Sequence, residues 1–267
     1  MKSQKPQKTR NRKDHWLPQG YLRGFIGPSR TAKEQPLFYF EKSTGEWRDV
    51  SPKEIGWGDG FYDYAKAGNN AISSDEVFAR PEREFPMLRQ QLIQNHFVGW
   101  EHHKSELLSY MQMIRARSPL AMSQWEEQAR GMRARTIDSA DFQPMDDEFV
   151  RDFQIVNMLK DVQAGPTWMT DFDWCLRYTD DENNSYCATD QALLLIGSEP
   201  AGTPVSDVLV HRDTRIVFPL CWQAALIGRK RKYDGEGLGC ATLDSIREIR
   251  HEQKLQATEF VVSPAPF

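Results

Sequence analysis

The spacing of apolar residues changes near residue 166, and this change limits the folds that the 267-residue chain can adopt. Before it, apolar residues recur every three or four positions across 85–114 and 149–159, which is typical of buried helix faces. Gly165 and Pro166 end the second of these helices. After them, apolar and polar residues alternate across 172–178, as in a half-buried strand.

Strands are predicted ahead of the helical segment as well as after it. A short helix is predicted to start at Pro18, and residues 37–50 form two apolar runs around a turn, which predicts a β-hairpin. Further strands are predicted within 185–227, an amphipathic helix over about 242–258, and a strand at 260–262 that closes the sheet. Because strands and helices occupy separate stretches, the sequence predicts an α+β fold with a short N-terminal helix and β-hairpin, a helical middle, and an antiparallel C-terminal sheet with a final amphipathic helix.

A basic tail precedes the predicted domain. The net charge of the chain is -4, but residues 1–13 carry +6, which leaves -10 for residues 14–267. We expect residues 1–13 to be disordered and residues 14–267 to form a single domain, with its helical middle at about 82–164 and its β-rich part at about 167–262. A basic arm on an acidic body is suited to reaching phosphates, although a solvated tail explains the same residues.

Several classes of site and location find no support in the sequence. The four cysteines are widely spaced without a Cys-x-x-Cys pair, and there is no His-Glu-x-x-His, Walker loop or Gly-x-Ser-x-Gly motif. We therefore predict no metal site, and we leave the cofactor unknown. The polar N-terminus and the short apolar runs predict no signal peptide and no membrane association, so we expect a cytoplasmic protein.

Three polar residues at intervals of four form the main candidate site. His15, Gln19 and Arg23 accompany a row of apolar residues, and Gln19 and Arg23 share a face if residues 18–26 are helical. Helix N-termini and arginine forks attract phosphate or carboxylate, and a histidine can act as a general base near neutral pH. The alternative is structural, with Arg23 paired to a carboxylate and His15 in a capping or core position.

Other charged residues are candidates for nucleic-acid contact or catalysis. Asp190 follows a predicted strand, where it either faces a site or hydrogen-bonds backbone amides in a turn. A band of arginines on the middle helices and a second basic cluster resemble a nucleic-acid footprint, but the pI of about 5.9 and nearby acids favour solvated, paired side chains. The band comprises Arg115, Arg117, Arg130, Arg133 and Arg135, and the second cluster is 229–232.

Fragments along the chain point together to a known family. Residues 15–25, His-Trp-Leu-Pro-Gln-Gly-Tyr-Leu-Arg-Gly-Phe, are similar to an opening His-Tyr-Val-Pro-Gln-x-Tyr-Leu-Arg-x-Phe motif, and shorter matches follow at 38–45, 60–62, 117–119, 188–190 and 218–220. In this order they resemble the bacterial family called domain of unknown function 4238. The chain departs from the family pattern at 191–192, where Gln-Ala replaces Asn-Pro, and at 221–222, where Cys-Trp replaces Ser-Pro.

The resemblance implies a cytoplasmic bacterial protein and, because some members are associated with anti-phage defence loci, an effector that acts on nucleic acid. Our first hypothesis is therefore a nuclease-like enzyme. His15 serves as acid or base, Asp190 orients a partner or holds a metal, and Gln19, Arg23 and Arg117 bind phosphate. This hypothesis requires His15, Arg23, Arg117 and Asp190 to converge in one pocket.

Two further hypotheses stay open. The second is a non-catalytic sensor or binding module for a nucleotide, a nucleic acid or a phage protein, with a pocket or groove that is lined with arginines and aromatics and lacks an acid–base pair. The third is structural, with His15 and Arg23 buried and paired away from any cavity. The sequence predicts neither the oligomeric state nor a protein partner.

Overall fold

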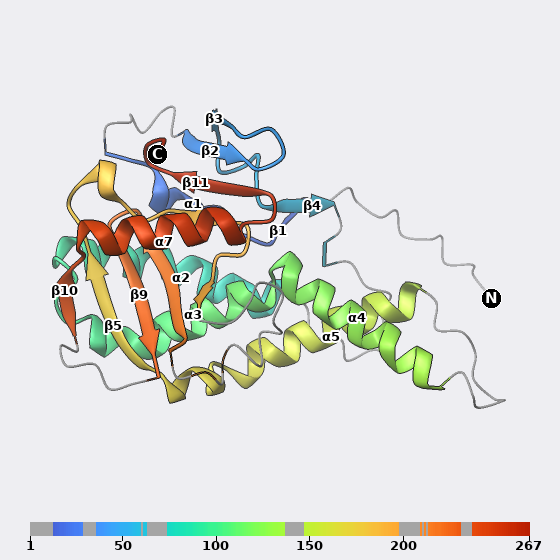
Figure 1. The fold of residues 1–267 in the computed structure, drawn as a ribbon. Helices are drawn as coiled ribbons and strands as arrows, with labels where there is room; N and C mark the ends of the chain where they lie inside the picture. Colours follow the sequence, from blue (N-terminus) through green and yellow to red (C-terminus); the bar gives the residue numbers. More distant parts are fainter. Residues whose placement is uncertain are drawn as a thin grey trace.

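The computed structural model describes residues 13–28, 36–59, 61–62, 74–136, 147–197, 209, 211, 213–230 and 237–267. Its architecture is α+β, which confirms the predicted class. A five-stranded sheet lies between helix α7 (Leu243–Gln256) on one face and helices α2 (Ser74–Gln94) and α3 (Lys104–Ala116) on the other (Figure 1). The predicted tail, residues 1–13, lies outside the described residues except for Lys13, which begins the first strand.

The five-stranded sheet is buried on both faces. The predicted alternation of buried and solvated residues along β5 is not observed, since Cys175 is buried like its neighbours Trp174 and Leu176, because α7 covers the face that was expected to be solvated. The pairs β5–β9, β9–β8 and β8–β7 are antiparallel, as predicted, but β10 runs parallel to β5, so the sheet is mixed. Its strands, in order, are β10 (Leu238–Cys240), β5 (Asp173–Tyr178), β9 (Ala224–Arg229), β8 (Arg215–Cys221) and β7 (Leu194–Ile196).

A second sheet joins the two ends of the described chain. The predicted N-terminal hairpin is present, and its turn places Gly45 at φ 74°, a left-handed conformation that favours glycine. The strand at 260–263 pairs with this hairpin rather than closing the C-terminal sheet. The sheet is antiparallel, in the order β3 (Glu46–Val50), β2 (Leu37–Glu41), β11 (Phe260–Ser263) and β6 (Ala188–Thr189).

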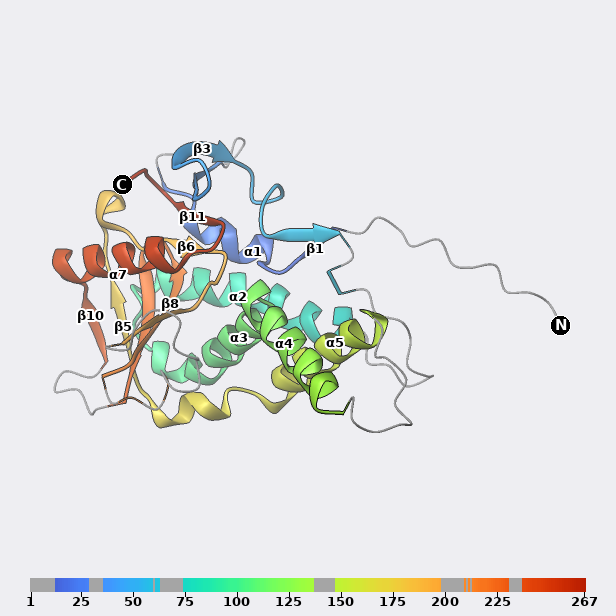
Figure 2. The ribbon, with the colours of Figure 1, turned by 45° about the vertical axis from the view of Figure 1, so that its right-hand side comes forward.

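Helices fill the middle of the chain, as predicted, but they begin at Ser74 rather than near residue 82. α4 (Pro119–Thr136) and α5 (Asp147–Ala164) lie side by side and extend away from the sheets (Figure 2). None of the helices in the described residues is long and apolar enough to cross a membrane. Short 3-10 helices connect the elements at Arg23–Phe25, Trp100–His103, Thr167–Asp171 and Glu182–Asn184.

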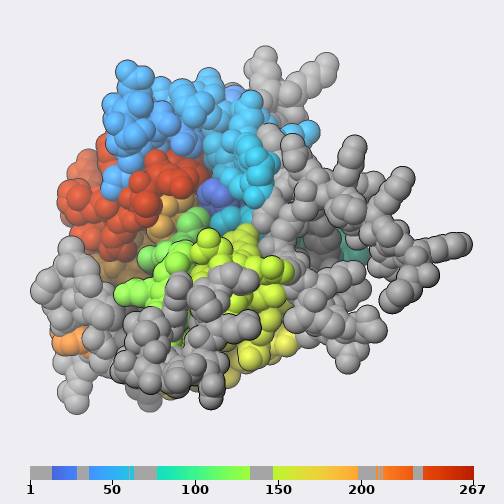
Figure 3. Space-filling model, turned by 90° about the vertical axis from the view of Figure 1, so that its right-hand side faces the viewer, coloured from blue at the N-terminus to red at the C-terminus, as the bar shows by residue number. Residues whose placement is uncertain are grey.

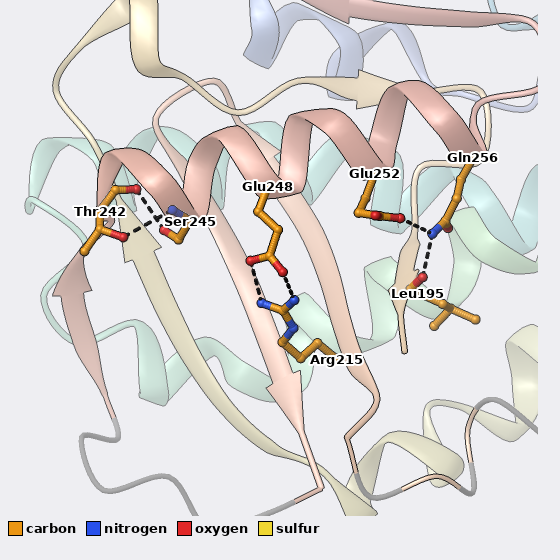
Figure 4. A network of polar contacts seen from close by, with 7 residues as sticks. All are labelled: Leu195, Arg215, Thr242, Ser245, Glu248, Glu252 and Gln256. Carbon is orange, nitrogen blue, oxygen red and sulfur yellow. Dashed lines mark hydrogen bonds and ion pairs between the residues drawn. The ribbon is translucent and has the colours of Figure 1, made fainter. Parts of the chain in front are cut away.

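Polar contacts fix α7 across the sheet (Figure 4). The Thr242 hydroxyl accepts a hydrogen bond from the Ser245 amide at 3.2 Å and so caps the N-terminus of the helix. Further along, Glu248 pairs with both terminal guanidinium nitrogens of Arg215 on β8. The Gln256 amide donates to the Leu195 carbonyl at 2.7 Å and so satisfies a backbone acceptor on the edge strand β7.

The N-terminal segment packs into the hydrophobic core at the centre of the fold. Strand β1 (Lys13–His15) pairs with β4 (Trp57–Asp59), and a single helical turn, α1 (Gln19–Leu22), follows it. Tyr21 on α1 is fully buried, stacks on Phe218 of β8 and donates a hydrogen bond to the Pro219 carbonyl at 3.0 Å. Arg89 of α2 donates to the Gly20 and Tyr21 carbonyls and thereby ties α1 to the helical layer.

The burial of Tyr21 allows a test of how the N-terminal segment packs into the core. We expect Tyr21→Ala to lower the free energy of unfolding by about 4 kcal/mol, because it empties a fully buried aromatic site. Leu255→Ala is the matched control, since the Leu255 residue is 59% exposed and its loss should change stability by less than about 0.5 kcal/mol. Urea denaturation measures the free energy of unfolding of both variants. Equal losses in the two variants would contradict the packing of Tyr21 in the core.

Candidate functional site

A pocket of about 410 Å³ opens where β1 and α1 meet α2. In Figure 3 the dark-blue atoms of the N-terminal segment lie at the centre of the face, between light-blue atoms and the green atoms of the helical layer. Polar and apolar side chains both contribute to its wall. The lining residues are Asp14, His15, Pro18, Gln19, Gly20, Tyr62, Phe78, Ala79, Glu82 and Arg117.

Arg117 holds the inner wall of this pocket together. It lies at the C-cap of α3, and each nitrogen of its guanidinium donates a hydrogen bond. Nε donates to the Tyr62 hydroxyl at 2.6 Å, Nη1 pairs with a Glu82 carboxylate oxygen, and Nη2 donates to the backbone carbonyl of His15. The guanidinium carbon also lies 4.2 Å from the centre of the Phe78 ring.

The burial of Arg117 decides what it can do. Its side chain is only 3% exposed. Burial alone lowers the pKa of Arg117, but attraction to Tyr62 and Glu82 and hydrogen bonds with them outweigh burial and raise the pKa above its usual value. Arg117 is therefore a permanent cation whose charge Glu82 balances, and its donors serve the fold rather than a phosphate.

His15 and Gln19 stand at the opening of the pocket. Both residues are half-buried, and the His15 Nε2 and Gln19 Nε2 atoms are 3.4 Å apart. Below them, the Asp14 carboxylate accepts a hydrogen bond from the Tyr62 amide at 3.0 Å. The contact that ties His15 to Arg117 involves the His15 backbone carbonyl, and His15 also lines the pocket.

Arg23 and Asp190 do not line the pocket. Arg23 lies one turn beyond Gln19, and its side chain is exposed. Asp190 is only 1% exposed, and both of its carboxylate oxygens accept from the Thr258 amide, at 3.0 and 3.2 Å. Burial raises the pKa of Asp190, while backbone hydrogen bonds act in the opposite direction. The structure thus brings His15, Gln19 and Arg117 together, and Asp190 instead links β6 to the turn before β11.

Several described members of the predicted basic clusters also make local contacts. Arg115 pairs with Asp161 at 3.6 Å, and Arg130 pairs with Glu126 at 2.8 Å, as expected for solvated, paired faces. In the second cluster, Lys230 lies over the Phe172 ring. The side chains of Arg133 and Arg135, and residues 231–232, lie outside the described residues.

Sequence reasoning did not single out several pocket residues. Phe78 and Glu82 are four apart on α2 and share a face, but nothing local distinguishes them from other residues of that helix. Tyr62 belonged to a family fragment without an assigned role, and Asp14 directly precedes the opening motif. Among the described residues, no three His, Cys, Asp or Glu side chains are grouped so that they could hold a metal ion.

The sequence profile of the family described as "Protein of unknown function (DUF4238)" matches residues 13–238. The chain belongs to this family. The match confirms the resemblance and includes every residue that lines the pocket. No curated protein and no solved structure matches this DUF4238 chain.

The network of Arg117 predicts a large stability effect in this DUF4238 protein. Arg117→Ala should lower the free energy of unfolding by about 3 kcal/mol, because it leaves Glu82 without its counter-charge and His15 and Tyr62 without a buried donor. Arg80→Ala removes an exposed ion pair with Glu84 on the same layer and should cost less than about 1 kcal/mol. Similar values for the two variants in chemical denaturation would refute the network.

The hydroxyl of Tyr62 gives a prediction for alkaline pH. Burial, opposed by Arg117, raises the pKa of Tyr62 from 10.0 to about 12 in the folded protein. The folded state therefore favours the protonated hydroxyl. The contribution of Tyr62 to the free energy of unfolding is complete below pH 10 and is lost as the pH rises from 10 to about 12. Tyr62→Phe should show a shallower loss of unfolding free energy than the wild type over this interval, and an identical pH dependence would contradict the assignment.

Proposed function

We propose that this DUF4238 protein is a non-catalytic binding module that holds a small polar ligand in the pocket between β1, α1 and α2. The observation that carries the proposal is a pocket of about 410 Å³ whose wall arginine is already fully engaged. This volume falls in the range of small-molecule sites, which combine apolar walls with a few polar groups. Here Pro18, Phe78 and Ala79 supply apolar surface, and His15 and Gln19 supply polar groups.

The charges in the pocket give less support to nuclease-like chemistry. Phosphodiester cleavage depends on positive charge placed against the phosphate in the transition state. Among the described lining residues, Asp14 and Glu82 contribute two carboxylates, and the one guanidinium is that of Arg117, whose donors are used within the wall. Asp190, which was expected to orient a partner or hold a metal, contacts Thr258 instead. The binding hypothesis needs none of these groups to act on a phosphate.

We further propose that the module senses its ligand in the bacterial cytoplasm during anti-phage defence. Family membership and the location of some family members at defence loci support this part of the proposal. Of the ligands considered from the sequence, a nucleoside-sized molecule suits a pocket of this volume better than a nucleic-acid strand or a protein.

Two assays test the proposal. Purified protein is incubated with RNA and with DNA, with and without divalent metal, beside His15→Ala. We expect no cleavage in any sample, because the pocket lacks a phosphate-facing cation among its described residues. Cleavage by the wild type that His15→Ala abolishes would establish the enzyme hypothesis instead.

The second assay measures the shift in melting temperature with a panel of nucleosides, nucleotides and small amines. Ala79→Trp fills the pocket from the exposed side of α2, so it should abolish any shift that the wild type shows. Met87→Trp places the same side chain on the same helix at a position that is 68% exposed and outside the pocket, so it should keep the shift. Equal loss or equal retention in the two variants would show that the ligand does not occupy this pocket.

A further inference from the structure

The ion pair in the pocket wall exposes its two partners unequally. The Arg117 side chain is 3% exposed, whereas the Glu82 side chain is 35% exposed. The guanidinium is therefore enclosed by His15, Tyr62 and Phe78, while the carboxylate of the same pair reaches solvent at the pocket. A ligand that enters meets the acceptor half of the pair.

The remaining polar groups strengthen this acceptor character. One Glu82 oxygen accepts from Arg117, and the other forms no hydrogen bond within the described structure. Each carboxylate oxygen has two acceptor positions, so Glu82 retains capacity on both oxygens. The Gln19 amide stands at the same opening, and its carbonyl oxygen is a further acceptor. Like charge from the Asp14 and Glu82 carboxylates disfavours a phosphate here.

We infer that the pocket takes a ligand with two adjacent N–H donors, as in a guanidinium group or the donor edge of a guanine base, and that Glu82 accepts them. This inference rests on the proposed binding function and specifies its ligand. A carboxylate accepts two parallel N–H bonds from such an edge with favourable geometry. Phe78 and Pro18 also line the pocket and contribute apolar contacts to its wall.

Equilibrium binding to the full chain, measured by calorimetry, tests this inference with four probes. Guanosine and agmatine carry the adjacent donors, on a neutral base and on a charged guanidinium, and together they distinguish the two sources of this chemistry. Adenosine lacks adjacent donors, and guanosine monophosphate adds a phosphate. We expect guanosine or agmatine to bind. Adenosine should bind at least about tenfold more weakly than the preferred one of these two probes, and guanosine monophosphate should bind no more tightly than guanosine.

Two variants assign the effect to the pocket. Glu82→Gln should weaken binding of the preferred probe at least about tenfold, whereas Glu84→Gln, in an exposed pair on the same helix, should not change it. Because Glu82→Gln also removes the partner of Arg117, Gln19→Lys provides a second variant that keeps the pair and adds a positive charge at the opening. It should also weaken binding about tenfold or more.

The possible failures are distinguishable. Tighter binding of adenosine or of the phosphate form, unchanged binding in Glu82→Gln, or tighter binding of the preferred probe in Gln19→Lys would overturn the inference while leaving a binding module. No binding by any of the four probes would overturn the inference as well. If the broader panel of the melting assay also gives no shift, the proposed function falls with it.

Discussion

One buried guanidinium connects segments that are far apart in the sequence. Arg117 lies where α3 passes into α4, and its hydrogen bonds reach β1 at His15, the 61–62 turn at Tyr62 and α2 at Glu82. A buried charge is costly unless it is paired and fully hydrogen-bonded, so the four segments must keep these relative positions. The pocket lies at the same junction and takes its shape from this constraint.

The hydrogen bonds of Arg117 also explain why the motif at residues 15–25 both stabilises the fold and forms part of the pocket wall. The Tyr21 side chain fixes α1 in the core against Phe218 and Pro219, and the His15 carbonyl is held by Arg117. The His15 ring and the Gln19 amide are left at the opening. A motif can therefore stabilise the fold through its backbone and apolar residues while its polar side chains line a pocket.

The sequence predicted what depends on local patterns. Helical spacing, strand alternation and the turn at Gly45 sufficed for the α+β class and the hairpin. The sequence did not predict the pairing between distant strands, because the residues of a strand do not determine which strand lies beside it. The parallel pairing of β10 with β5 and the antiparallel pairing of β11 with β2 were therefore not predicted.

The candidate site shows the same division. The spacing of His15, Gln19 and Arg23 suggested one shared site. The pocket, however, lies at the beginning of α1, and Arg23 follows the end of this helix, about 6 Å along the axis from Gln19. The role of Glu82 depends on its contact with Arg117, 35 residues away in the sequence. The His15 carbonyl accepts a hydrogen bond from Arg117 through the backbone, and every residue type has a backbone carbonyl, so the sequence does not indicate this role. The turn role of Asp190 was foreseen as an alternative and matches its contacts with Thr258.

Nuclear magnetic resonance of the Arg117 guanidinium in nitrogen-labelled protein tests the central claim most directly. If Arg117 is held by His15, Tyr62 and Glu82 within the wall, its Nε and Nη protons should give separate signals, with hindered rotation and slow exchange with water, in the ligand-free protein. The same signals should stay unchanged when phosphate is added. A freely rotating, fast-exchanging guanidinium, or one whose signals shift on phosphate addition, would contradict the account.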